Sequence, residues 1–287
     1  MTATGIRFGP DWSATLRRGT EQELASWLEF ALACADAADE LARGYFRSEL
    51  EVARKADGSF VTQADRAIET MLRERIADTF PDHGVHGEEL GEEAESAAMR
   101  WYLDPIDGTH NFLRGIPLFG VLLAVERDGE LQAGVISAPI LGQRWYASRG
   151  GGAWTLGGPS GGQRRRLHVS RIGQLDEAQI VFRSVTDMRA SRVAGGFERL
   201  IGQVWRERGY GDFWGYALVA DGSAEAMMEQ DLGPWDLAAP WVIVEEAGGA
   251  ITDFDGNRSM ARGEGFATNG ILHATILAQL ARGKSAI

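Results

Sequence analysis

The sequence predicts a protein of the α+β or α/β class, in which helices and strands share one large core. Two amphipathic helical patterns come first, within residues 21–80, and short strand patterns follow from Trp101. Beyond residue 163, strand-like and helix-like segments alternate, which is typical of a second α/β lobe. Of the 287 residues, 44% are hydrophobic and 24% are charged, so the chain can bury an extensive core.

The two N-terminal helices are predicted from the spacing of their apolar residues. Over 21–46 and again over 64–80, apolar side chains recur at steps of three and four, and Pro81 ends the second pattern. The single cysteine, Cys34, lies within the first helix. We expect its thiol to pack as a small hydrophobe and not to act as a nucleophile.

The middle of the chain predicts an antiparallel sheet. From Trp101 onward, apolar strand patterns are separated by turns, and Asp-Gly at 128–129 is typical of a two-residue hairpin. Residues 148–163 are rich in Gly, Ser and Pro, which predicts a boundary between lobes at 1–157 and 158–287. No Lys-Ser or Lys-Thr closes these glycines, so we do not expect a phosphate loop.

The remaining segments define the second lobe. Strands are predicted at 178–182, at 224–229 and around 248–254. Helices are predicted around 192–208, 214–221 and 237–247.

The charge balance excludes some partners. Lys and Arg number 29 against 41 Asp and Glu, a formal net charge of −12, whereas nucleic acid and anionic membranes need a basic surface. The basic run 164–166 is therefore expected to be a solvated face. The chain has no 18-residue apolar run, and its first residues lack the apolar segment of a secretory signal, so we expect a cytoplasmic protein. The negative net charge does not exclude a small anionic substrate, because metal ions held by carboxylates can reverse the local charge.

The most informative segment is Asp104-Pro105-Ile106-Asp107-Gly108, directly after a strand pattern. Two carboxylates three positions apart at a strand end would share one small volume, and the glycine would allow a close backbone approach. The residues after it can begin a short helix whose free N–H groups face an anion. Asp, Pro and Gly are also ordinary turn residues, so a plain turn is the alternative.

Two further acidic residues favour a metal site. Glu88 lies in a polar loop, where the alternative is a solvated acid. Asp236 opens a predicted helix, where the alternative is a helix N-cap. Together with Asp104 and Asp107 they offer hard oxygen ligands suited to Mg²⁺. The five histidines lack the spacing of a zinc site.

Three motifs resemble the signatures of the inositol monophosphatase superfamily. They are GEE at 87–89, DPIDGTHNF at 104–112 and WDLAAPWVIVEEAGG at 235–249, and the resemblance extends from Lys55 through the second lobe. It implies a layered αβαβα sandwich, commonly a homodimer. It also implies Mg²⁺-dependent hydrolysis of a small phosphomonoester by metal-activated water, without a covalent intermediate.

The same resemblance implies the ligands of two or three Mg²⁺ ions per site. A first ion would be bound by Glu88, Asp104 and the backbone carbonyl of Ile106. A second would lie between Asp104, Asp107 and Asp236.

Further positions follow from the motifs. Thr109 would orient the attacking water with support from Asp65 in the Val-Thr-x-x-Asp stretch 61–65. The backbone N–H groups of Gly108 and Thr109 would hold phosphate oxygens.

Within the superfamily, three stretches are most similar to the histidinol-phosphate phosphatase branch: 111–125, 137–154 and 211–229. Asp212 stands where inositol monophosphatases typically carry a small neutral residue. Histidinol phosphate carries an ammonium group near its ester, which a carboxylate would bind selectively. Asp212 and Glu229 are the candidate substrate contacts, with a helix N-cap as the alternative for Asp212. Trp214 is not assigned a substrate role.

The expected function is therefore Mg²⁺-dependent hydrolysis of L-histidinol phosphate in histidine biosynthesis. The alternatives are an inositol-1-phosphate phosphatase, a broader small-molecule phosphatase of the same superfamily, and a catalytically silent metal-binding protein. Thr109 argues against the silent protein, which would have no need of a residue that orients water.

Overall fold

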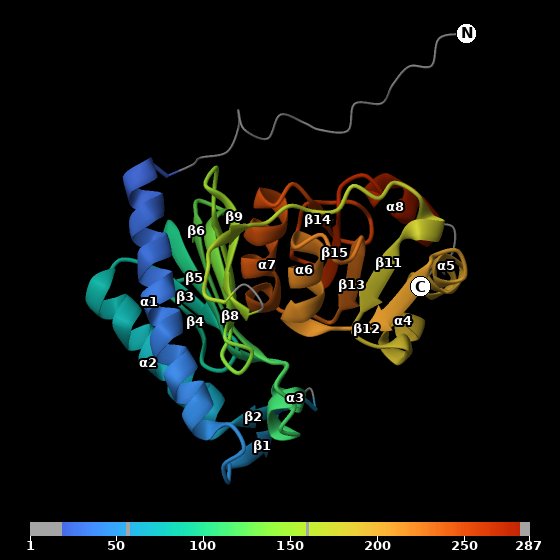
Figure 1. Ribbon diagram of the computed structural model, residues 1–287. Helices are drawn as coiled ribbons and strands as arrows, with labels where there is room; N and C mark the ends of the chain where they lie inside the picture. The colour runs from blue at the N-terminus through green and yellow to red at the C-terminus, as the bar shows by residue number, and fades with distance from the viewer. Residues whose placement is uncertain (1–18, 56–57, 159–160, 282–287) are drawn as a thin grey trace.

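The computed structural model describes residues 19–55, 58–158 and 161–281, which form alternating layers of helices and sheets (Figure 1). Helices α1 and α2 cover the outer face of an eight-stranded sheet, and α6 and α7 lie between this sheet and a five-stranded one (Figure 1). The far face of the five-stranded sheet is covered by α4, α5 and α8 (Figure 1). The predicted αβαβα sandwich is confirmed. The helices are α1 (Glu21–Tyr45), α2 (Gln63–Thr79), α3 (Thr109–Leu113), α4 (Val185–Ala190), α5 (Ala194–Ile201), α6 (Asp212–Ala220), α7 (Pro234–Glu246) and α8 (His273–Ala281), with a 3-10 turn η3 (Leu175–Glu177).

The eight-stranded sheet has the order β10-β9-β8-β7-β6-β5-β3-β4. Strands β3 and β5 are parallel, and the other neighbours are antiparallel. Because helices cover both faces, residues 120–125 of β6 are all buried, which accounts for their continuous apolar run. The strands are β3 (Gly84–Gly87), β4 (Gly91–Glu93), β5 (Met99–Asp107), β6 (Gly120–Arg127), β7 (Glu130–Ala138), β8 (Gln143–Ser148), β9 (Gly152–Gly157) and β10 (Arg165–Arg166).

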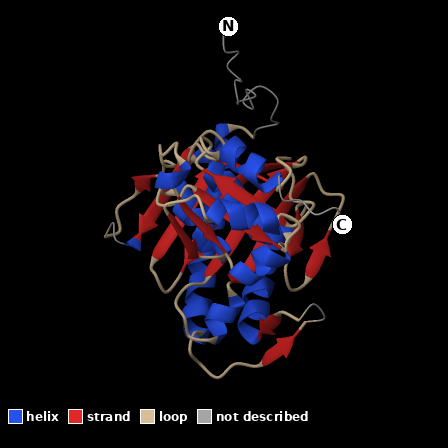
Figure 2. Ribbon diagram, turned by 90° about the vertical axis from the view of Figure 1, so that its right-hand side faces the viewer, coloured by secondary structure: helices blue, strands red, loops and turns tan. Residues whose placement is uncertain are grey.

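The five-stranded sheet has the order β12-β11-β13-β15-β14 and mixes parallel with antiparallel pairs. A separate hairpin, β1 with β2, projects from the lower end of the molecule in both views, next to α3 (Figure 1, Figure 2). These strands are β11 (Gln179–Phe182), β12 (Arg206–Gly209), β13 (Ala226–Gln230), β14 (Ala250–Thr252), β15 (Glu264–Thr268), β1 (Val52–Arg54) and β2 (Phe60–Thr62).

Three hydrophobic clusters hold the layers together. One joins α1 and α2 to the eight-stranded sheet, one surrounds α6 and α7, and one lies beneath α5 and α8. Cys34 is fully buried in the first cluster, as predicted, and burial raises the pKa of its thiol to about 11. The thiol is therefore protonated and unreactive at neutral pH.

Most predicted elements are confirmed within a few residues. Helices α1 and α2 match the predicted ranges, and Asp128 and Gly129 both have positive φ, at 51° and 83°, as a tight hairpin turn requires. The helix predicted over 192–208 is wrong at its end. Residues 206–209 form the edge strand β12, whose polar sequence Arg-Glu-Arg-Gly carries no apolar alternation.

Several elements of the second lobe were not predicted: α4, α8 and β15. Asp104 and Asp107 were expected at a strand end, with a plain turn as the alternative, and β5 extends through both residues to Asp107. The predicted division at residue 157 remains a prediction. Arg165 and Arg166, beyond that point, still pair with β9 in the eight-stranded sheet.

The three basic residues at 164–166 lie at the edge of the eight-stranded sheet and are exposed, as expected of a solvated face. Across the described ranges, no helix combines the length and apolarity needed to cross a membrane. The cytoplasmic prediction rests partly on residues 1–18, which lie outside the part of the chain that the structure describes.

Candidate active site

Three carboxylates converge at the end of β5. The pairing of β5 with β6 shifts register between Asp104 and Asp107, and this irregularity lets both side chains face the start of α7. One carboxylate oxygen each from Asp104, Asp107 and Asp236 lies within 4.8 Å of the others. The N–H of Ile106 donates to Asp104 Oδ1 at 3.0 Å, which fixes the first side chain. The arrangement is one that could hold a metal ion.

Asp236 reaches this cluster from the first turn of α7. Its carboxylate accepts a hydrogen bond from the N–H of Gly233, the N-cap residue, at 2.6 Å. Asp236 is therefore the third residue of the helix and not its N-cap, the alternative that its position in the sequence suggested. One oxygen of the same carboxylate belongs to the acidic cluster.

Glu88 lies beside the cluster but is held by a lysine. The ammonium of Lys55 contacts Glu88 Oε1 and Glu89 Oε1, both at 2.7 Å. Glu88 is not in the group of oxygens within 4.8 Å, although its charge raises the pKa of both Asp104 and Asp236. The structure thus brings together three of the four predicted carboxylate ligands and places the fourth next to them.

The turn after β5 presents backbone groups to the same volume. Gly108 has φ 84°, and a Cβ there would lie 3.2 Å from the carbonyl oxygen of Leu118 and 3.4 Å from Asp212 Oδ2. A side chain at 108 would therefore be strained as well as crowded. The hydroxyl of Thr109 donates to the carbonyl oxygen of Ile106 at 3.0 Å. A carbonyl oxygen has two lone pairs, so a second partner, such as a cation, is compatible with this bond.

Asp65 has two roles at the start of α2. Its Oδ2 accepts hydrogen bonds from the N–H and the hydroxyl of Thr62, at 2.8 and 2.5 Å, in a capping box. The Val-Thr-x-x-Asp pattern is thus a helix cap as well as a family motif. Its Oδ1 is buried and has no hydrogen-bond partner among the described residues. Burial raises the pKa of Asp65 to about 6, and the charge of Glu88 adds to the shift.

Two further carboxylates border the cluster on its other side. Asp212 begins α6 in the left-handed region, with φ 58°, and its N–H donates to Glu229 Oε1 at 3.3 Å. The next N–H, of Phe213, donates to Asp107 Oδ2 at 2.5 Å. The N-cap alternative for Asp212 is not supported, since Gly211 is the N-cap of α6 and no side chain caps this helix.

Arg183 joins this group and was not predicted from the sequence. Its Nε lies 2.8 Å from Asp187 Oδ2 and 3.8 Å from Glu229 Oε1. No motif surrounds Arg183, because it follows β11 and reaches the site only through the pairing of β11 with β13.

The site is strongly acidic. Burial and mutual repulsion raise the pKa of Asp104, Asp107 and Glu229 well above the ordinary range, and raise that of Asp236 to about 7. Two polar atoms at the site, Glu229 Oε2 and the hydroxyl of Tyr216, are buried without a partner in the described chain. Hard oxygen donors and repelling charges fit a divalent cation of the Mg²⁺ type.

This repulsion predicts how stability depends on pH. The native pKa values of Asp65 and Asp236, about 6 and about 7, exceed the unfolded value of 3.8, so the folded chain binds more protons between these limits. Stability in the absence of metal must then fall as pH rises through this window. In EDTA we expect Tm to drop by roughly 5 °C between about pH 5.5 and pH 8. Thermal melts with and without Mg²⁺ test this, because bound Mg²⁺ should remove most of the drop; a Tm that is level or rises in EDTA would contradict it.

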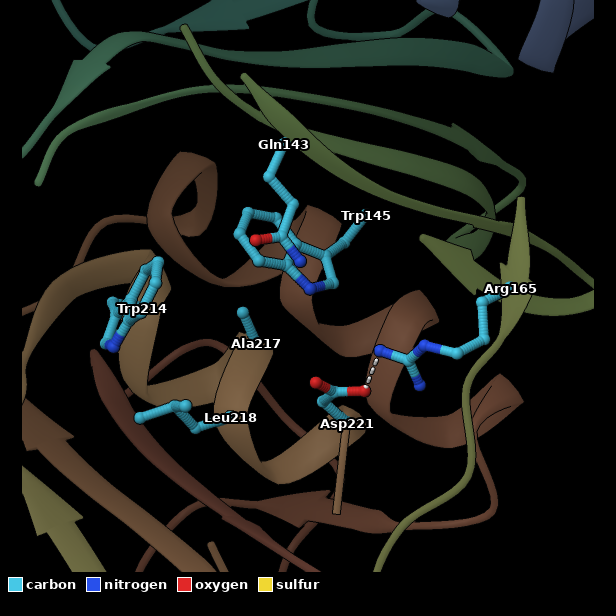
Figure 3. A pocket seen from close by; sticks show the side chains of 7 residues that line it. All are labelled: Gln143, Trp145, Arg165, Trp214, Ala217, Leu218 and Asp221. Atoms are coloured by element: carbon cyan, nitrogen blue, oxygen red, sulfur yellow. Dashed lines mark hydrogen bonds and ion pairs between the residues drawn. The ribbon is translucent and has the colours of Figure 1, made fainter. Parts of the chain in front are cut away.

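A separate pocket of about 370 Å³ lies beside α6, away from the acidic cluster. Figure 3 shows Trp214 at one side of it and the ion pair of Arg165 with Asp221 at the other. Trp145 and Trp214 meet edge to face there, with ring centroids 5.9 Å apart. Trp214 thus lines this pocket, on a different side of α6 from Asp212.

Comparison with known proteins agrees with this geometry. The sequence model of the inositol monophosphatase family matches residues 23–285. The chain belongs to the inositol monophosphatase family. This is a metal-dependent phosphatase family, whose members act on small phosphorylated substrates.

Curated relatives of the chain include three histidinol-phosphatases, at 38–42% identity. That of Mycobacterium tuberculosis is 42% identical over 257 residues, covering 89% of this chain and 98% of the relative. That of Streptomyces coelicolor is 40% identical and covers 88% and 96%. An inositol-1-monophosphatase of Mesorhizobium japonicum is 34% identical and covers 79% and 85%.

Solved structures show the same fold. The extragenic suppressor protein suhB of Bartonella henselae superimposes with a TM-score of 0.81 at 30% identity, covering 90% of this chain and 99% of the other. The inositol monophosphatase of Anabaena gives a TM-score of 0.78 at 29% identity, covering 91% and 97%. The layered fold predicted from the motifs is thus that of the family.

Proposed function

We propose that this protein is an Mg²⁺-dependent phosphatase that hydrolyses L-histidinol phosphate to L-histidinol and phosphate in histidine biosynthesis. The observation that carries the proposal is the presence of Asp212 and Glu229, two carboxylates that border the acidic cluster and are not among the proposed metal ligands. Relatives with 38–42% identity that are named histidinol-phosphatases support it.

The pair offers a binding site for a cation next to the phosphate. Gly108 begins the turn that would hold the phosphate, and Asp212 Oδ2 lies against it. An ammonium group near the ester would therefore meet a carboxylate, with a charge-assisted hydrogen bond between them. A neutral polyol phosphate gains little from that contact, so the pair favours an amino-substituted ester.

The metal ions would be held by the carboxylates at the end of β5 and the start of α7. The proposed ligands are Glu88, Asp104, the Ile106 carbonyl, Asp107 and Asp236. When bound, two or three Mg²⁺ ions supply hydroxide near neutral pH and neutralise charge on the leaving oxygen. Lys55 contacts Glu88 Oε1, so Glu88 would join them through its other carboxylate oxygen or by releasing the lysine.

Protein groups position the water and the ester. The hydroxyl of Thr109 donates its proton to Ile106, so its oxygen is left to accept a hydrogen bond from the attacking water. Asp65 Oδ1, which is buried and has no hydrogen-bond partner in the described ranges, would be a second acceptor. The N–H groups of Gly108 and Thr109, at the start of α3, would hold the phosphate oxygens that gain charge.

A direct comparison of substrates tests the proposal. Phosphate release from histidinol phosphate and from inositol 1-phosphate would be measured side by side, with Mg²⁺ and with EDTA. We expect a higher kcat/KM for histidinol phosphate and no release in EDTA. A higher kcat/KM for inositol 1-phosphate would overturn the substrate assignment, and no metal-dependent release from any ester would favour a silent metal-binding protein.

The resemblance to the family supports two further proposals. We propose that the protein is a homodimer and that it acts in the cytoplasm. Analytical ultracentrifugation of the full chain would contradict the first if it gave only the 31.2 kDa monomer.

A further inference from the structure

A buried ion pair on α2 holds the turn that carries Glu88. Glu69 is completely buried, and its Oε1 accepts from Arg73 Nε at 2.8 Å. Both residues lie on the face of α2 that also carries Asp65, one turn before Glu69. A buried ion pair adds little to folding stability compared with apolar packing, so stability alone does not explain why Glu69 and Arg73 are buried here.

The pair contacts the backbone of the turn at successive positions. Glu69 Oε2 accepts from the N–H of Glu89 at 2.7 Å, and Oε1 accepts from the N–H of Leu90 at 3.1 Å. Arg73 Nη2 donates to the carbonyl oxygen of Gly91. The chain from 89 to 91 is therefore bound to α2 through charged groups.

Two further contacts complete the support of Glu88. Its own N–H donates to the carbonyl oxygen of Leu103 in β5, the residue before Asp104, at 3.1 Å. Gly87 makes the approach of Glu69 possible, since a Cβ at 87 would lie 2.1 Å from Glu69 Oε1. The backbone of Glu88 is thus bound to β5, the strand that carries Asp104. The next residues of the turn are bound to α2, the helix that carries Asp65.

We propose that Glu69 is a positioning residue for the metal site: it fixes the 88–91 turn so that the Glu88 carboxylate can complete the first Mg²⁺ site. This inference rests on the proposed Mg²⁺-dependent function. Glu69 touches neither the substrate nor the metal, and acts through the peptide groups of Glu89 and Leu90. Arg73 supports it by orienting the Glu69 carboxylate.

The test is Mg²⁺ binding by calorimetry on the full chain without substrate. Glu69→Gln keeps the shape of the side chain but places an NH₂ group against one of the backbone donors. We expect a Kd for Mg²⁺ raised roughly 10- to 100-fold, the usual effect of losing a residue that supports metal ligands. At saturating Mg²⁺, kcat should be largely retained, because the reacting groups are intact.

Glu225→Gln is the matched control. Glu225 is also a buried glutamate that accepts from a backbone N–H, that of Gln179 at 2.6 Å, but it lies directly before β13, at the opposite end of that strand from Glu229. It should lower Tm without changing Mg²⁺ affinity. If Glu69→Gln does not fold, Arg73→Lys replaces it, and the same direction of change in Kd is expected.

Unchanged Mg²⁺ affinity in the folded Glu69 or Arg73 variant, or an equal change in Glu225→Gln, would overturn the inference. The result is separable from the proposed function. Weakened Mg²⁺ binding in a protein that does not hydrolyse histidinol phosphate would refute the substrate alone, and unchanged binding in an active phosphatase would refute only the positioning role.

Discussion

Asp107→Asn is expected to abolish turnover of every phosphate ester. Asp107 offers one of the three converging oxygens, and asparagine replaces a charged metal ligand by a neutral amide. Loss of several kcal/mol of transition-state stabilisation, at about 1.4 kcal/mol per factor of ten, lowers kcat/KM by about 10³-fold or more. The fold should survive, because the amide oxygen can still accept from the N–H of Phe213. Removing one of several repelling buried charges should also leave the metal-free protein at least as stable as the wild type.

Asp253→Asn is the control for Asp107→Asn, and we expect it to affect stability and not activity. Asp253 is an equally buried aspartate, but it closes a loop in the second lobe by accepting from the N–H groups of Asp255 and Asn257, both at 2.8 Å. Its Oδ2 accepts from the side-chain amide of Asn257. In Asp253→Asn the new NH₂ group would therefore either face the NH₂ group of Asn257 or replace the oxygen that accepts from the backbone N–H groups. We expect full activity with a lower Tm. Steady-state kinetics and thermal melts would be measured on both variants. If Asp107→Asn kept more than a few per cent of wild-type kcat/KM, the assignment of Asp107 as a metal ligand would be refuted.

Local sequence patterns placed Asp104 and Asp107 together at a strand end but left a plain turn as the alternative, and the family motifs joined Asp236 to them. The residues from Asp104 to Thr109 are contiguous, and a strand that ends in two aspartates and a glycine constrains its own geometry. For Asp236, the local pattern predicted the start of a helix, but its exact position, third in the helix with its carboxylate accepting from the N–H of Gly233, was seen only in the structure. The layered fold followed from the motifs and not from periodicity alone.

Contacts between distant elements were not predictable in the same way. Arg183 and Glu69 reach the site because β11 pairs with β13 and α2 packs on β5, and neither residue lies in a recognisable motif. The salt bridge of Glu88 with Lys55 likewise joins residues 33 positions apart. Edge strand β12 was missed for a related reason: its polar residues have a strand conformation only because β11 offers a partner.

Asp212→Asn is expected to lower kcat/KM for histidinol phosphate selectively. Losing one charge-assisted hydrogen bond to the substrate ammonium costs about 1.5–3 kcal/mol, or roughly 10- to 100-fold. Asparagine is preferable to alanine here, because Asp212 has φ 58° and asparagine tolerates the left-handed region, whereas alanine would add backbone strain. Activity on inositol 1-phosphate, which has no ammonium group, should be largely retained.

Asp231→Asn is the matched control for charge and backbone. Asp231 is another aspartate with φ near 60°, and its side chain is 76% exposed. Both substitutions remove one negative charge near Arg183, yet only Asp212 lies against the turn that would hold the phosphate. A general effect of net charge would therefore appear in both variants, and a specific contact only in Asp212→Asn. Equal losses on histidinol phosphate and inositol 1-phosphate would show that Asp212 supports the site as a whole, through its N–H bond to Glu229, and does not select the substrate.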